Sequence, residues 1–148
     1  MNNTHPLVTI PMKKIKLLDG NYLYGIKARI FNQSGYMIID TGALFNVLDD
    51  SLTNYEYKAI PFINDDELKV AGISSEEISN VIIRDVGNIF LSRNKYYLGY
   101  TTILPLLHIK EKFEEKYSIL GLLGNNFFKE HNAIINYHAE TIKVNKGI

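Results

Sequence analysis

Short runs in which apolar and polar residues alternate fill most of the chain and predict many short β-strands. In the clearest run, Ile26, Ala28 and Ile30 point to one side, and Lys27 and Arg29 point to the other. The predicted strands lie at 7–18, 26–30, 36–39, 55–62, 86–91 and 96–104 and in a hairpin at 133–144. Turns are expected at Asp19-Gly20, 32–35, 92–94 and 138–140.

Helical patterns are few. Pro105 opens a run in which Leu106, Ile109, Phe113 and Tyr117 fall on one helical face, so a helix is expected there. A short helix is compatible with the residues after Ala43, and another is expected to begin at Asn125 or Asn126 and to end at His131.

Residues 67–83 fit two structures. A hairpin with its tip at residues 72–75 is favoured, but Ser74-x-x-Glu77 is also a capping-box pattern that starts helices. Because strands greatly outnumber helices, the sequence predicts a mostly β protein, a barrel or a sandwich, with residues 1–148 in a single domain.

Composition narrows the class of protein. The 148 residues are 46% hydrophobic and 22% charged, as expected of a domain with a sizeable core. Sixteen basic residues balance sixteen acidic ones, so no overall charge attracts nucleic acid or a membrane surface. Neither an export signal nor a membrane-spanning run is found, and cysteine is absent, so we expect a cytoplasmic protein without disulfides or a thiol nucleophile. The four histidines have no metal-ligand spacing, and neither a metal nor a cofactor is expected.

One motif carries the candidate chemistry. The buried strand 36–39 runs directly into Asp40, Thr41, Gly42 and Ala43. A carboxylate at the end of a buried strand is costly to keep charged unless function requires it, and the glycine lets another backbone or a ligand approach. Far downstream, ILGLLGNNFF forms a second glycine-containing motif at 119–128.

Together these motifs resemble the retropepsin-like aspartic proteases, and the resemblance covers most of the chain. It implies a mostly β, single-lobe acid-protease barrel with one or two short helices. It also implies peptide hydrolysis by a water held between two carboxylates, one of which acts as general base. Because the chain has one Asp-Thr-Gly and Asp85-Val86-Gly87 is interpreted as a turn, the resemblance implies a homodimer in which two Asp40 residues meet.

The resemblance also implies a role for each neighbour. Thr41 would hydrogen-bond across the dimer, and Gly42 would let the loops and the substrate approach. Ala43, Leu123 and Gly124 would line the substrate site, and Gly72 and Ile73 would lie in a covering flap. Since Ala43 offers no hydroxyl to the carboxylate, activity is expected at weakly acidic to near-neutral pH. Asn125 stands where the retroviral enzymes have arginine, so their ion pair is not expected.

Two functions remain open at this stage. The first is an aspartic endopeptidase that binds an extended peptide or protein substrate as an added strand. The second is a catalytically inactive dimeric module that binds a peptide or protein on the same barrel. An intact Asp40 favours the enzyme, because a binding module has no need for two like charges in contact.

Overall fold

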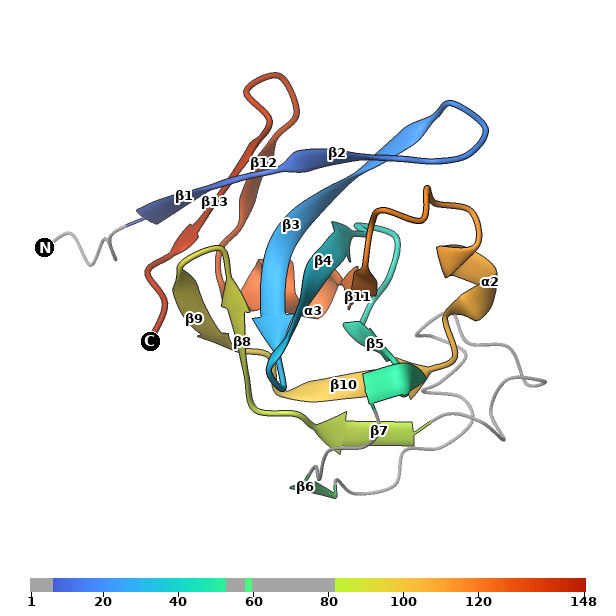
Figure 1. Cartoon of the computed structure of the whole chain (residues 1–148). Helices are drawn as coiled ribbons and strands as arrows, with labels where there is room; N and C mark the ends of the chain where they lie inside the picture. Colours follow the sequence, from blue (N-terminus) through green and yellow to red (C-terminus); the bar gives the residue numbers. More distant parts are fainter. Residues whose placement is uncertain (1–6, 53–57, 60–81) are drawn as a thin grey trace, which may run out of the picture.

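The computed structural model describes residues 7–52, 58–59 and 82–148, and strands dominate them (Figure 1). The strands are β1 (Leu7–Pro11), β2 (Lys13–Lys16), β3 (Tyr22–Ile30), β4 (Gln33–Ile39), β5 (Val47–Asp49), β6 (Lys58–Ala59), β7 (Ile82–Asp85), β8 (Asn88–Leu91), β9 (Asn94–Tyr97), β10 (Tyr100–Leu104), β11 (Ile119–Leu123), β12 (Ile134–Asn136) and β13 (Thr141–Asn145). The helices are the 3-10 turn η1 (Asp50–Leu52), α2 (Leu107–Lys110) and α3 (Asn125–Glu130). The expectation of a mostly β chain with one or two short α-helices is confirmed for the described residues.

Ten strands form the main sheet. Their order is β6-β7-β10-β5-β11-β4-β3-β8-β9, and β2 pairs with the first half of β3, at residues 22–25. In the described residues no pairing joins β6 to β9, so the closure expected of a barrel is not seen. The parallel pairing of β11 with β4 and of β10 with β5 places strands from distant parts of the chain at the centre of this sheet.

A second, three-stranded sheet has the order β1-β13-β12. It unites the first and last described strands, with Ile10 opposite Ile142, and both side chains are buried. The hairpin expected at 133–144 is confirmed as β12 and β13. Figure 1 shows this sheet lying beside β3, so that its inner face closes one side of the core.

The alternation predicted for β3 is confirmed. Ile26, Ala28 and Ile30 are buried, whereas Lys27 and Arg29 are exposed. The expected hairpin at Asp19-Gly20 is also present, because β2 and β3 pair antiparallel on either side of it. Most buried residues form one large cluster, and a smaller cluster of Ile15, Ile38, Phe113 and Ile119 lies under β2.

Several local predictions were wrong. The helix expected after Pro105 ends at Lys110, because the chain then turns and pairs with residues 16–18 at the end of β2, where Leu17 bridges to Phe113. The periodic apolar residues are still drawn inward, since Leu106 and Phe113 are both buried. The helical pattern therefore predicted the burial of these residues correctly. It predicted the backbone conformation correctly only for the first helical turn.

The turn expected at 32–35 is shorter than predicted. Phe31 and Asn32 make the turn with positive φ angles, and β4 begins at Gln33. Gly35 lies inside β4, where an added Cβ would stand 2.4 Å from the carbonyl oxygen of Ser118. This glycine is therefore required by close packing and not by a turn.

The short helix considered after Ala43 is absent, and the chain instead enters β5 at Val47. The expected helix near Asn125 is confirmed as α3, but Gly124 caps it and no side chain does. Apart from β7, the hairpin expected at 67–83 lies outside the described residues. Within the described ranges, no helix has the length and apolar character needed to span a membrane.

Candidate active site

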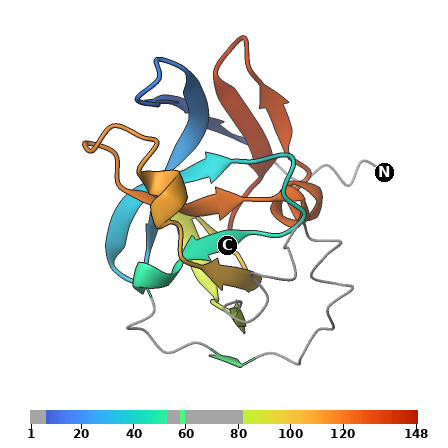
Figure 2. The ribbon, with the colours of Figure 1, turned by 90° about the vertical axis from the view of Figure 1, so that its right-hand side faces the viewer.

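The loop at 40–46 encloses the end of β11. β11 pairs with β4 on one side and with β5 on the other, and the loop joins these two outer strands. It must therefore pass across the carboxyl end of β11, where Leu123 leads into Gly124. Figure 2 shows this path, with the loop curving from β4 to β5 around the tip of β11.

Asp40 begins this loop and is held by hydrogen bonds to the backbone of two other residues. Its N–H donates to the carbonyl oxygen of Leu123 at 3.0 Å, which extends the β4–β11 pairing by one residue. One carboxylate oxygen, Oδ1, accepts the N–H of Gly42 at 3.0 Å. The Asp40 side chain is half-buried, and Thr41 and Gly42 are exposed. The carboxylate is thus fixed in orientation and still accessible.

Gly124 lies directly beneath the loop. A Cβ at this position would stand 2.4 Å from the carbonyl oxygen of Phe45 and 3.0 Å from that of Ala43. The two residues after Gly124 donate their backbone N–H groups to the loop. Asn125 donates to the carbonyl oxygen of Ala43 at 2.8 Å, and Asn126 donates to that of Leu44 at 3.0 Å. The two glycine motifs of the sequence therefore meet in space, and the first turn of α3 supports the acidic loop.

Asn46 is a residue that the sequence analysis missed. Its side chain is 1% exposed, and its Oδ1 accepts the N–H of Gly124 at 2.9 Å. Its backbone carbonyl accepts the N–H of Thr102 at 3.0 Å. Asn46 thus ties the end of the loop both to β11 and to β10. The signal that was available is a polar residue between the apolar Phe45 and Val47, just before a buried strand.

Asp85 resembles Asp40 only in its local turn. Its Oδ1 accepts the N–H of Gly87 at 3.0 Å, as Asp40 does with Gly42. Its Oδ2, however, accepts the hydroxyl of Tyr97 at 2.7 Å, and this hydrogen bond raises the pKa of Tyr97 to about 12. The interpretation of Asp85-Val86-Gly87 as a turn agrees with this geometry, because β7 ends at Asp85 and only Val86 and Gly87 separate it from β8.

Known proteins were compared with the chain by sequence and by structure. No protein-family model matches the sequence. No curated protein matches it either. The structure, however, is similar to the crystal structure of a retropepsin-like aspartic protease from Rickettsia conorii, with a TM-score of 0.50 and 12% identity over 99% of this chain and 97% of that one. The chain has the retropepsin-like aspartic protease fold.

Within this retropepsin-like fold, six of the eight predicted site residues lie together. Asp40, Thr41, Gly42 and Ala43 form the first half of the loop, and Leu123 and Gly124 lie where β11 ends. Gly72 and Ile73 are outside the described residues. Leu123 is fully buried, so its side chain has no free surface for a peptide, and it supports Asp40 through its carbonyl instead. In the described part of the chain, no group of three or more His, Cys, Asp or Glu residues could hold a metal ion.

Proposed function

We propose that the protein is a homodimeric aspartic endopeptidase, in which a water between two Asp40 carboxylates, one from each subunit, attacks the peptide bond. The observation that carries this proposal is the position of Asp40. On a retropepsin-like fold, the loop at 40–46 presents this carboxylate at the surface, with the Asp40 N–H bonded to Leu123 and its Oδ1 bonded to the N–H of Gly42. A carboxylate so placed can accept a proton from water as a general base.

The second copy is required by the chemistry. General base catalysis on the water and proton donation to the carbonyl oxygen need two carboxyl groups that share one proton. Asp85 cannot serve as the second group, because its carboxylate is already engaged by Gly87 and Tyr97. A two-fold axis beside Asp40 would supply an identical carboxylate from a second chain.

The remaining residues receive supporting roles. Thr41 is exposed beside Asp40 and would hydrogen-bond to the opposite loop, and Gly42 leaves room for the substrate backbone. Ala43, which is half-buried, would form part of the floor of the cleft, and Gly124, which is buried beneath the loop, would support that floor. Gly72 and Ile73 would cover the substrate from above, as the family resemblance implies. An extended peptide held between floor and cover would be hydrolysed without a metal or cofactor.

The test compares two substitutions of similar local geometry. Asp40→Asn keeps an oxygen to accept the Gly42 N–H but cannot act as a base, so cleavage of a peptide library should fall at least about 10²–10⁴-fold while the protein stays folded. Asp85→Asn, which alters the same kind of turn away from the loop, should retain activity. Equal activity of the wild type and Asp40→Asn would exclude the mechanism.

A peptide that carries a hydroxyl-bearing tetrahedral carbon in place of the cleaved bond provides an independent readout. It should inhibit the wild type strongly, because it resembles the tetrahedral intermediate. A dimer that binds extended peptides without cleaving them would instead support the inactive binding module.

A further inference from the structure

Basic residues gather around the β8–β9 hairpin, at one edge of the main sheet, although the whole chain has no net charge. No aspartate or glutamate occurs in β3, β4, β8 or β9 or in the final segment 141–148. These same segments and the turn between β8 and β9 contain six cations, and five of them form what we call the basic face. The basic face consists of Lys27, Arg29, Arg93, Lys95 and Lys146.

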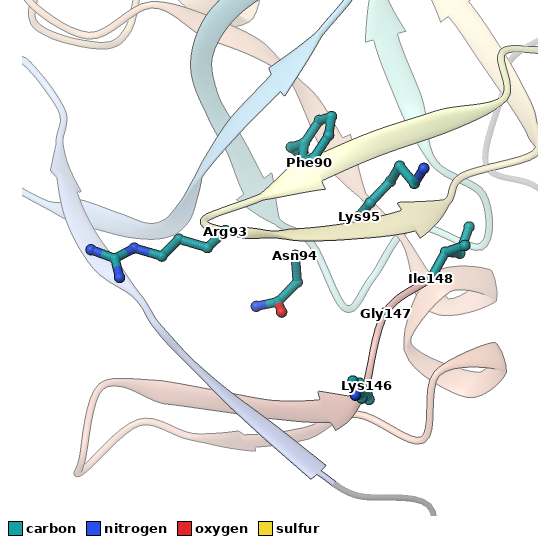
Figure 3. A pocket seen from close by; sticks show the side chains of 7 residues that line it. All are labelled: Phe90, Arg93, Asn94, Lys95, Lys146, Gly147 and Ile148. Carbon is teal, nitrogen blue, oxygen red and sulfur yellow. The ribbon is translucent and has the colours of Figure 1, made fainter.

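The centre of the basic face is a row of directly paired residues. Arg29 on β3 lies opposite Phe90 on β8, and Phe90 lies opposite Lys95 on β9. The Arg29 guanidinium covers the Phe90 ring at 4.6 Å from its centre. Figure 3 shows Phe90 and Lys95 rising from the same side of the β8–β9 hairpin. Two cations therefore flank one aromatic ring on an outward-facing surface.

Two hollows flank the turn of this hairpin. One, of about 280 Å³, is lined by the turn, by Phe90 and by the last residues of the chain, and it contains Arg93, Lys95 and Lys146 (Figure 3). The other, of about 200 Å³, contains Lys27 and Arg29 beside Ser34 and Ser92. Neither is lined by an acidic residue. The ion pairs found in the described residues, Lys110 with Asp49 and Lys116 with Glu114, leave the five cations unpaired.

The basic face is remote from the candidate active site. Along β4, Lys27 lies opposite Tyr36, four residues and therefore about 13 Å from Asp40, and Arg29 lies opposite Ser34, six residues and about 20 Å from it. A ligand held there would not compete with a peptide bound at Asp40.

We propose that the basic face binds an acidic segment of a protein partner. Acidic residues two apart in an extended segment lie about 7 Å apart, and the strands of Arg29 and Lys95 are separated by about 10 Å, so these long side chains can reach both carboxylates. The methylene groups of glutamate would pack on the exposed edge of Phe90. The hollows, of about 280 and 200 Å³, are large enough to admit single side chains.

Other anionic partners fit less well. Single-stranded nucleic acid needs free aromatic faces for base stacking, and the Arg29 guanidinium already covers Phe90. A membrane surface is flat and cannot enter hollows of this kind, and its binding is strengthened by apolar side chains that insert into the bilayer. The observations therefore favour a polypeptide.

The experiment measures fluorescence anisotropy of a short labelled oligoglutamate peptide at low and at physiological salt. Asp40→Asn is present in every protein sample, so that the probe is not cleaved whether or not the chain is a peptidase. Substituting Arg29→Gln and Lys95→Gln together should weaken binding about tenfold. The matched control, Lys16→Gln with Lys112→Gln, removes two exposed cations elsewhere and should change binding little. If the first pair impairs folding, Lys27→Gln with Lys95→Gln replaces it.

Three results would overturn the proposal. One is absence of binding at low salt. Another is an equal loss in both double variants, which would mean that only net charge matters. The third is tighter binding of oligothymidine or of anionic phosphatidylserine vesicles than of oligoglutamate, with the same dependence on Arg29 and Lys95, which would assign the face to a different class of partner. Each result is independent of the proposed peptidase activity.

Discussion

Gly124 and Phe45 touch backbone to backbone. A Cβ added to Gly124 would lie 2.4 Å from the carbonyl oxygen of Phe45 and 2.6 Å from its carbonyl carbon. Both are main-chain atoms, which cannot rotate away as the end of a side chain can. The loop that carries Asp40 can therefore adopt its observed path only if residue 124 has no side chain.

Gly124→Ala should accordingly destabilise the protein and displace the loop. We expect the free energy of unfolding in urea to fall by about 1–3 kcal/mol, the usual cost of overpacking. Gly42→Ala is the comparison, because its Cβ would meet only the Asp40 carboxylate, at 3.3 Å. That variant should stay stable but lose peptidase activity. Equal stability of Gly124→Ala and the wild type would show that the loop yields easily.

Asn46→Ala tests the side chain that ties the loop to β11. It leaves the buried N–H of Gly124 without its acceptor, which should cost about 1–3 kcal/mol of unfolding free energy. Asn136→Ala removes the same kind of bond, an Asn oxygen accepting the N–H of Ala139, from an exposed hairpin. Because water replaces that bond, the control should cost far less. Similar losses in the two variants would contradict the assignment of Asn46 as a positioning residue.

The site residues that could be predicted from the sequence are those whose residue type is unusual for their place in the local pattern. An acid after a buried strand and a glycine between a buried strand and a helix each report a local constraint, so Asp40 and Gly124 could be found. The sequence marks Asn46 only as a polar residue before a buried strand, and its role could not be predicted, because that role depends on a contact with Gly124, 78 positions away. The basic face was hidden for a similar reason. Its cations are dispersed in the sequence and are gathered only by the pairing of β3, β8 and β9.

The fold shows the same division. Strands with strict alternation, such as β3, were found because one face is buried. The helix expected after Pro105 was overestimated, because Phe113 satisfies a helical period and a strand bridge to Leu17 equally well. The choice between these is made by tertiary pairing, which a local pattern does not contain.

The proposed dimer predicts a concentration-dependent mass. Light scattering should show a species of twice the 16.9 kDa chain mass as concentration rises. Thr41→Arg would place two like charges at the axis and should yield monomers without cleavage activity, whereas Ser34→Arg, at the other end of β4, should still dimerise. In the three-stranded sheet β1 already pairs with β13 within one chain. Only the outer edges of β1 and β12 could therefore contribute to the contact between subunits. A monomer that cleaves peptides would refute the shared site.

The last prediction concerns Asp49, a buried carboxylate at the end of β5. Its Oδ1 accepts the N–H of Leu106 at 2.9 Å, and its Oδ2 accepts Lys110 Nζ at 2.8 Å and the hydroxyl of Ser51. Burial by itself would raise the pKa of Asp49, but the hydrogen bonds from Lys110, Ser51 and Leu106 outweigh it and lower the pKa below the ordinary 3.8. A lowered pKa in the folded state stabilises the protein above pH 3.8, and this contribution is lost as the pH falls through the lowered value.

Asp49→Asn should therefore reduce the free energy of unfolding by about 1–3 kcal/mol at neutral pH, and the difference from the wild type should shrink as the pH falls below 3.8. Urea unfolding across that pH range measures it. Asp50→Asn, at the exposed neighbouring position, should change the free energy by no more than about 0.5 kcal/mol at any pH. A difference for Asp49→Asn that is the same at neutral and acidic pH would mean that Asp49 acts through its shape. Its charge would then not contribute, because only the ionised carboxylate attracts Lys110.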